Sequence, residues 1–140
     1  MITLSRQTDY AYRVILHLAT LPPGTRVTAQ DIARRRIIPR ALVRRIITHL
    51  GKAKLLTTTR GMGGGLALAR PASKISLLDV TQAMEGTISL NACVTNPHAC
   101  RLMKVCSVHE VWVDAHARLL AQLSQATFDK LAQRARVLER

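Results

Sequence analysis

The feature that most limits how this chain can fold is a glycine-rich turn between two short apolar or β-branched segments. Residues 55–59 (LLTTT) are typical of a strand, and residues 66–69 (LALA) are typical of its return strand, which Pro71 ends. Between them lies the run RGMGGG at 60–65, whose glycines permit positive φ and close backbone approach. The pattern predicts a β-hairpin. A nucleotide-binding loop is disfavoured, because no Gly-Lys-Ser/Thr ending follows the glycines.

Three helices are expected before this hairpin. Residues 8–20 carry apolar side chains at helical spacing, and Pro22-Pro23-Gly24 ends the pattern. Thr28 can cap a short second helix, with Asp31 three residues on. A turn at 36–38 follows, and Pro39 suits the first position of a third helix. The third helix is expected to bury one face, formed by Val43, Ile46, Ile47 and Leu50.

Two short helices joined by a tight turn predict a helix-turn-helix, and a hairpin directly after the second helix predicts a wing. Two packed helices with solvated arginines are the alternative if the helices are considered alone. We therefore expect a mainly α fold with a small β wing, in which residues 1–71 form a winged helix-turn-helix DNA-binding domain. The side chains and turn residues expected to contact DNA are Thr28, Arg40, Ala41, Arg44, Arg45, Thr48, Arg60, Gly61, Gly63 and Gly64.

The charge distribution favours a polyanionic partner. The formal net charge is +13, and residues 1–70 hold 13 of the 21 Lys and Arg residues but only two acids, Asp9 and Asp31. Aromatic residues make up only 3% of the chain, which disfavours base stacking on single strands and favours duplex DNA. No apolar run approaches membrane-spanning length, and no signal-peptide pattern is present. The expectation is a cytoplasmic protein without a membrane partner.

The second half, residues 72–140, is expected to pack as one compact unit that holds a sensor loop and a long dimerisation helix. Ser76 can cap a helix from Leu77 to Glu85, and a loop is expected over 87–99. A long helix from about Cys100 to Ser124 and a short last helix from 127 to 131 are expected next. The long helix carries a coiled-coil-like seam of Val105, Val108, Trp112, Ala115 and Leu119.

A homodimer is the physical expectation for such a chain. The apolar seam needs a partner, which is either the N-terminal domain or the same helix of a second subunit. One recognition helix and one wing contact few base pairs, whereas two related subunits recognise a palindromic operator about one helical turn apart.

The three cysteines are clustered in the pattern Cys93-x6-Cys100-x5-Cys106-x2-His109. Three soft ligands so close in sequence can converge on one metal centre, and a Cys3His set suits either zinc or an iron–sulfur cluster. Three free thiols, or a metal-free reversible disulfide under oxidant, are the alternatives.

An enzymatic role is not expected. An iron–sulfur electron-transfer protein is a further alternative, but the basic N-terminal half counts against it. The sequence contains no catalytic triad or paired-acid motif and no signature of a small-molecule substrate pocket.

Several segments, taken together, resemble the IscR/NsrR family of bacterial winged-helix regulators over nearly the full chain. They are LSRQTDYA at 4–11, TTTRGMGGG at 57–65, ARP at 69–71, ISLLDV at 75–80 with Glu85-Gly86, and the cysteine loop with the long helix after it. The gap between Cys93 and Cys100 is one residue longer than is usual in that family.

The resemblance implies a homodimer formed through the long helix, and an iron–sulfur cluster on Cys93, Cys100 and Cys106 whose state alters DNA binding. For the fourth ligand it implies either His109, with a 2Fe–2S cluster, or Asp9 of a partner subunit, with a 4Fe–4S cluster. We favour His109 and 2Fe–2S slightly, because the spacing to Cys106 needs no partner chain. The expected function is a transcriptional repressor that senses redox state, nitric oxide or iron–sulfur supply, and a purified apo form would lack the cluster.

Overall fold

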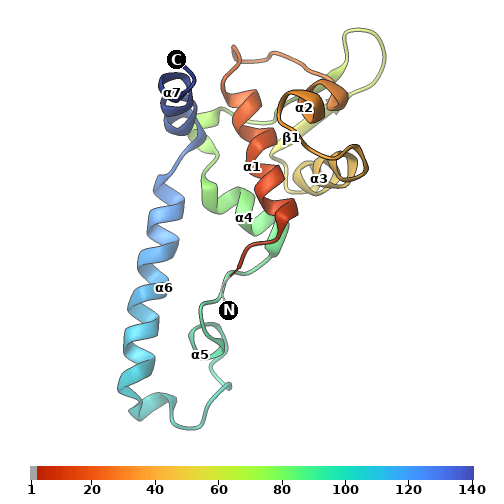
Figure 1. Ribbon diagram of the computed structural model, residues 1–140. Helices are drawn as coiled ribbons and strands as arrows, with labels where there is room; N and C mark the ends of the chain where they lie inside the picture. The colour runs from red at the N-terminus through yellow and green to blue at the C-terminus, as the bar shows by residue number, and fades with distance from the viewer. Residues whose placement is uncertain (1–2) are drawn as a thin grey trace.

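The N-terminal half adopts the predicted winged helix-turn-helix in the computed structural model, which describes residues 3–140. Three helices, α1 (Arg6–Ala19), α2 (Ala29–Arg35) and α3 (Arg40–Lys52), precede the strands β1 (Leu56–Thr59) and β2 (Gly65–Leu68). Figure 1 shows α2 and α3 on one side of α1, with the hairpin loop projecting beyond them. The predicted fold class, mainly α with a small β wing, is confirmed.

Side-chain caps set where these helices begin. The Ser5 hydroxyl accepts a hydrogen bond from the Thr8 amide at the start of α1, at 3.3 Å. The Thr28 hydroxyl accepts one from the Asp31 amide at the start of α2, at 3.1 Å. Each cap satisfies a backbone donor that the first helical turn leaves free. The Thr28 cap was predicted, whereas α1 begins at Arg6, two residues before the predicted start at residue 8.

The hairpin is short and closely packed at its turn. The strands pair antiparallel from Leu56↔Leu68 to Thr59↔Gly65, and Gly65 has φ of +140°. A Cβ atom at Gly64 would lie 2.2 Å from the Thr59 carbonyl oxygen, so the turn requires glycine at this position. A bridge between Val27 and Leu66 attaches the hairpin to the segment before α2.

The C-terminal half differs in part from the sequence prediction. It contains η1 (Ala72–Lys74), α4 (Leu77–Glu85), α5 (Ala92–Thr95), η2 (Met103–Val105), α6 (Ser107–Gln125) and α7 (Phe128–Leu138). The prediction for α4 is confirmed, including its capping box between Ser76 and Asp79.

Three predicted boundaries were wrong. The long helix begins at Ser107 and not near Cys100, because the chain from Cys100 to Val105 turns and ends in the 3₁₀ segment η2, which places Val105 outside the seam. The loop over 87–99 contains α5. The last helix extends to Leu138, because it buries Phe128 and Ala132 on the core.

The hydrophobic core surrounds α1. Ala11, Val14 and Ile15 of α1 are fully buried, and they share one cluster with residues of α3, α4 and α7, including Val80 and Phe128. In contrast, α6 has no buried residue, and Figure 1 shows it running away from the rest of the chain with α5 beside its far end. No helix within residues 3–140 is both long enough and apolar enough to cross a membrane.

Candidate DNA-binding face and cysteine pocket

The outer face of α3 is basic and open to solvent. All four predicted core residues of this helix are buried, which directs the opposite side outward. The predicted contact residues on that side are all exposed: Arg40, Ala41, Arg44, Arg45 and Thr48. The Thr48 hydroxyl donates to the Arg44 carbonyl oxygen at 2.9 Å, whereas no acid on α3 pairs with its arginines.

A hollow of about 280 Å³ lies where α2 meets the start of α3. Thr28 and Arg40, both predicted contact residues, line it together with Arg34. Arg34 was missed by the sequence prediction; its position three residues after Asp31 on a helix could have indicated the ion pair, which forms at 2.8 Å. Asp31 also lines the hollow, so Arg40 and the Thr28 hydroxyl, and not the paired Arg34, are the groups that could contact a phosphate.

The wing presents its loop to solvent. Arg60, Gly61 and Gly63 are exposed and Gly64 is half-buried. Met62, which the sequence prediction did not include, is fully exposed in this loop. The predicted wing residues therefore form one projecting loop, with Arg60 next to the end of β1.

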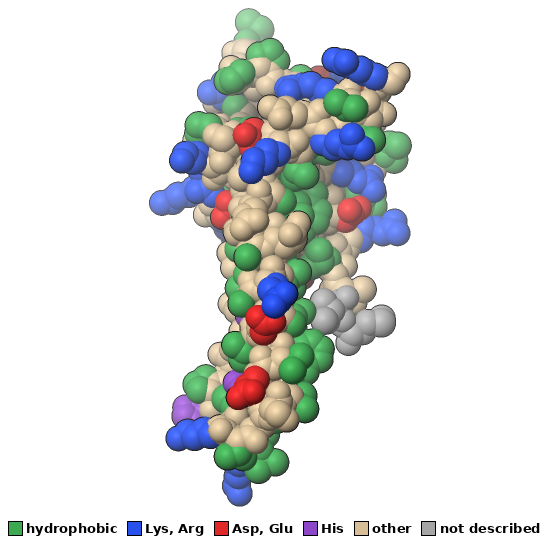
Figure 2. Space-filling view, turned by 90° about the vertical axis from the view of Figure 1, so that its left-hand side faces the viewer, with side chains coloured by type: hydrophobic (Ala, Val, Ile, Leu, Met, Phe, Trp, Pro, Cys, Tyr) green, Lys and Arg blue, Asp and Glu red, His purple; other side chains and the backbone are tan. Residues whose placement is uncertain are grey.

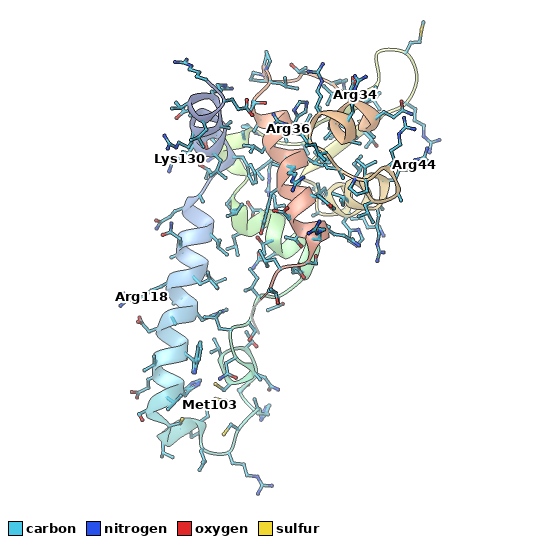
Figure 3. All side chains as sticks on the ribbon, viewed as in Figure 1. Arg34, Arg36, Arg44, Met103, Arg118 and Lys130 are labelled. Atoms are coloured by element: carbon cyan, nitrogen blue, oxygen red, sulfur yellow. The ribbon has the colours of Figure 1, made fainter. Side chains whose placement is uncertain are left out.

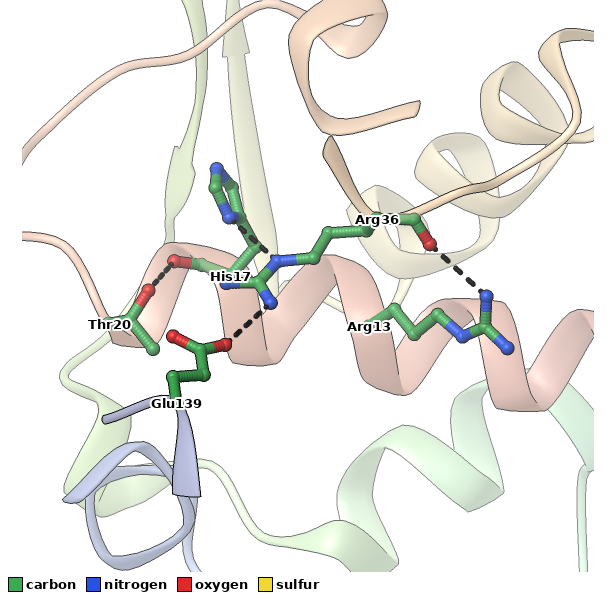
Figure 4. A network of polar contacts seen from close by, with 5 residues as sticks. All are labelled: Arg13, His17, Thr20, Arg36 and Glu139. Carbon is green, nitrogen blue, oxygen red and sulfur yellow. Dashed lines mark hydrogen bonds and ion pairs between the residues drawn. The ribbon is translucent and has the colours of Figure 1, made fainter. Parts of the chain in front are cut away.

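The turn between α2 and α3 is connected to α1 and to the residue after α7 by a network of polar contacts (Figure 4). Arg13 of α1 donates to the carbonyl oxygens of Arg36 and Ile37, at 3.1 and 3.2 Å. The Arg36 Nε donates to Nδ1 of the buried His17 at 3.0 Å, and its Nη1 pairs with Glu139 after α7 at 3.1 Å. Burial, and then the positive charges of Arg36 and Arg35, lower the pKa of His17, which keeps the acceptor nitrogen neutral.

Basic side chains are concentrated at the end of the molecule that carries α2, α3 and the wing. Figure 2 shows Lys and Arg concentrated over the upper part, while the lower part shows apolar side chains and few charges. Figure 3 places Arg34 and Arg44 on the side of α2 and α3, and Met103 at the opposite end of the molecule. The basic face and the cysteine loop are therefore well separated.

The three cysteines and His109 line one pocket beside the start of α6. Its volume is about 280 Å³. Cys93 comes from α5, Cys100 from the loop, and Cys106 is the N-cap of α6. All three thiols are free, with Cys100 exposed and the other two half-buried. The sequence prediction that these four residues converge is consistent with this placement.

The donor chemistry of this pocket fits a soft metal centre. The Nδ1 atom of His109 is buried and has no hydrogen-bond partner among the described residues. An orphaned imidazole nitrogen among three thiols is a ligand set for iron–sulfur clusters or zinc. Within residues 3–140, however, no three such groups already stand at metal-binding distance from one another, so ligation would require the loop to close further.

Met103 and Trp112 also line the pocket, and neither was predicted to do so. Trp112 was assigned to the helix seam, but its position three residues after His109 places both on one face of α6. Asp9, the alternative fourth ligand, does not line the pocket of its own chain: it is exposed on α1 and pairs with Arg13 at 3.1 Å.

Hydrogen bonds connect the two halves along α1 and α4. One Glu85 carboxylate oxygen accepts from the Ser5 amide at 2.7 Å and from the Thr8 hydroxyl at 2.6 Å. These bonds lower the pKa of Glu85. Tyr12 of α1 also shares a hydrogen bond with Thr81 of α4. The start of α1 is thus attached to the end of α4, which packs against α6.

Comparison with known proteins gives a family. Residues 4–134 match the model of the family Rrf2, described as iron-dependent transcriptional regulators. A Mycobacterium tuberculosis protein named as an HTH-type transcriptional regulator is 36% identical over 86 residues, which is 61% of this chain. The chain spans about half of that relative's length, 53%.

Solved structures show the same fold. CymR of B. subtilis, the global cysteine regulator, has a TM-score of 0.79 at 21% identity, covering 95% of this chain and 98% of CymR. T. potens IscR has a TM-score of 0.71 at 23% identity, covering 94% and 88%. The oxidized form of Staphylococcus aureus CymR has a TM-score of 0.70 at 21% identity, covering 94% and 96%.

Proposed function

Because this chain belongs to the Rrf2 family of transcriptional regulators, we propose that it is a homodimeric repressor whose affinity for duplex DNA depends on the state of its cysteine pocket. Residues 1–71 bind DNA, and residues 72–140 sense and dimerise. The observation that carries the proposal is the pocket remote from the basic face, which is lined by three free cysteines and by His109, whose buried Nδ1 has no partner among the described residues.

The DNA-binding part of the proposal rests on the exposed arginines of α3 and the wing. A bidentate guanidinium is the usual partner of guanine in the major groove, and we assign this role to Arg44. Arg60 enters the adjacent minor groove, where narrow A·T tracts attract a cation. Arg40 and Thr28, at the hollow between α2 and α3, contact the backbone phosphates.

The two arginine assignments are tested with labelled operator duplexes in a fluorescence anisotropy titration. Arg44→Ala should relax specificity at one base position, and Arg60→Ala should weaken binding to A·T-rich flanks. Lys130→Ala is the control, because Lys130 is an exposed cation on α7, outside α3, the wing and α6. Unchanged binding in both test variants would remove the assignment.

The homodimer is proposed through α6. This helix of 19 residues has no buried residue, and its Val108 and Val111, three residues apart on one face, are exposed by 62% and 67%. Burial of a valine side chain stabilises by about 1.5–3 kcal/mol, so covering this face favours association. Sedimentation should give a dimer, and Val111→Lys should weaken it. A wild-type monomer at micromolar concentration would contradict the proposal.

For the cofactor, we propose an iron–sulfur cluster on Cys93, Cys100 and Cys106 with His109, of the 2Fe–2S type. A 4Fe–4S cluster with Asp9 of the partner subunit is the alternative. Such a cluster supplies a centre that oxidant, nitric oxide or iron limitation can alter. The chain already connects this site to α1: α5 packs on α6, α6 packs on α4, and Glu85 and Thr81 of α4 hydrogen-bond to Thr8 and Tyr12 of α1, so a change in the loop can reach α1 through these contacts.

The cofactor is tested by anaerobic purification with iron and sulfide analysis and Mössbauer spectroscopy. Brown protein with iron and acid-labile sulfide supports the cluster. His109→Ala and Asp9→Ala distinguish the two ligand sets, because only the true ligand changes the spectrum. Colourless protein that contains zinc would contradict the cluster but leave DNA binding intact.

A thiol switch without metal is the second candidate. The exposed Cys100 favours it, because oxidants reach exposed thiols first. The solved oxidized form of the structurally similar S. aureus CymR also favours it. Peroxide followed by mass spectrometry of iron-free protein should then show a disulfide among the three cysteines, and reduction should restore the original DNA affinity.

A further inference from the structure

A cavity of about 540 Å³ lies between α1, β2, η1 and α7, at the end of the molecule remote from the cysteine pocket. In Figure 1 this is the region where α7 lies beside the C-terminal end of α1. Its volume falls within the range of small-molecule sites, roughly 300–1,000 Å³. Its walls come from both halves of the chain, and the function proposed above makes no use of it.

One wall of the cavity carries an acid, Asp129, with one carboxylate oxygen that has no partner among the described residues. Asp129, Gln133 and Arg136 line the cavity and are spaced at i, i+4 and i+7, so they follow one face of α7. The Oδ1 atom of Asp129 is buried and has no hydrogen-bond partner among the described residues. Hydrogen bonding from Thr127 lowers the pKa of Asp129, so its carboxylate is charged and can accept from a donor in the cavity.

The cavity is also lined by a cationic side chain, Arg70. Arg70 lines the cavity and pairs with Asp79 at 3.6 Å. Asp79 accepts from the Ser76 amide at 2.8 Å, and Ser76 forms a β-bridge with Thr127, two residues before Asp129. A guanidinium has five donors, so the one long ion pair leaves donors of Arg70 free for a second carboxylate.

The rest of the lining is mainly apolar. It includes Leu18 and Leu21 near the end of α1 and Leu68 of β2. The cavity therefore combines a carboxylate in need of a donor, a guanidinium with spare donors, and an aliphatic wall. A fatty acid would leave Asp129 unpaired, and an alkylamine would leave Arg70 without a second acceptor. Each mismatch therefore leaves one charged group with a hydrogen-bonding position that the ligand does not fill.

We propose that this cavity is a binding site for a free α-amino acid with an apolar side chain. The ammonium group meets Asp129, the carboxylate meets Arg70, and the side chain lies against the leucines. These three features complement one zwitterionic ligand, whose charged groups are adjacent and whose body is aliphatic.

If the chain binds DNA as proposed above, a ligand in this cavity should also change the affinity for DNA. Arg136 of α7 donates to the Thr20 carbonyl oxygen at 3.1 Å, and Glu139 pairs with Arg36 in the turn before α3. Figure 4 shows the second of these contacts. A ligand that changes how α7 sits on α1 therefore changes the support of the turn that positions α3.

The test is titration calorimetry of the full chain with L-leucine, L-methionine and L-phenylalanine. The analogues 4-methylvalerate and 3-methylbutylamine lack the ammonium group and the carboxylate respectively. At least one amino acid should bind with a Kd of about 1 mM or below, and both leucine analogues should bind at least tenfold more weakly. No heat and no shift in melting temperature with any of the three amino acids would overturn the proposal.

Variants separate this site from binding elsewhere. Asp129→Asn keeps the shape and removes the charge, and Ala72→Leu fills the cavity from η1; each should weaken binding at least tenfold. Lys130→Ala is the matched control, because the exposed Lys130 neighbours Asp129 but does not line the cavity. Equal affinity in the wild type and both cavity variants would also overturn the site.

Operator titrations with and without the bound amino acid give the second readout. A change in affinity supports the coupling to the turn. Amino-acid binding without such a change overturns the coupling alone, and a wild type that binds no operator at all contradicts the proposed function and not the site.

Discussion

Replacing Gly64 by alanine should distort the hairpin turn of the wing, whereas the same replacement at a glycine within a helix, Gly51, should not disturb the structure. The added Cβ atom would lie 2.2 Å from the Thr59 carbonyl oxygen and 2.9 Å from that of Gly61. Relief requires a backbone movement of about 1 Å, because overlap of this size far exceeds what packing tolerates. The turn bond from the Gly64 amide to Gly61, and the pairing of Thr59 with Gly65, should both be lost.

At about 0.5–1.5 kcal/mol for each hydrogen bond, the loss is about 1–3 kcal/mol. For a chain of this size that corresponds to a fall in melting temperature of roughly 3–5 °C for each kcal/mol. Circular dichroism measures the melting temperature, and anisotropy with operator DNA measures the loss of the wing contact.

Gly51→Ala is the matched control for this experiment. Gly51 lies within α3 with open space around its Cβ position, so alanine there should stabilise by about 0.5–1 kcal/mol. If Gly64→Ala left both the melting temperature and the DNA affinity of the wild type unchanged, the structural explanation of the glycine run would be refuted.

Three further predictions concern α1 and the turn before α3. Ile37 has φ of +55° and is 80% exposed, so Ile37→Asn should relieve strain and raise the free energy of unfolding by about 1 kcal/mol; a lower melting temperature would contradict this. Because the folded-state pKa of His17 lies below 6.5, the unfolded chain takes up its proton first, and stability should fall as pH drops below about 6.5 in thermal melts. His17→Gln should flatten that dependence. Because the pKa of Glu85 is lowered from 4.5, its stabilisation is complete above that pH and lost below it, so Glu85→Gln should lower the melting temperature at pH 7 but not in strong acid.

Much of the N-terminal half could be predicted because its determinants are local. Thr28 caps a helix through a hydroxyl three residues from the amide it binds. Pro39 was predicted at the first position of α3 and lies one residue earlier, as its N-cap. The buried and exposed faces of α3 follow from helical spacing alone. These interactions need no information about the rest of the chain.

The errors occur where tertiary contacts decide. The segment from Cys100 to Val105 has helix-compatible residues, yet it turns to close the cysteine pocket. The helix α7 continues past Leu131 because it packs on α1, which lies more than a hundred residues earlier. The hydrogen bond between Arg36 and His17 joins residues 19 apart, and no local sequence pattern predicts it. The cavity between α1 and α7 likewise has no sequence signature.

In the proposed function, the state of the cysteine pocket sets the affinity for DNA. The most direct measurement is one anisotropy titration of operator DNA with a single preparation, before and after anaerobic iron–sulfur reconstitution, with Cys93→Ser run in parallel. Reconstitution should change the wild-type Kd by about tenfold, within the usual range of coupling between sites, and should leave the Kd of Cys93→Ser unchanged. An identical wild-type Kd in both states, with the cluster shown to be present, would contradict it.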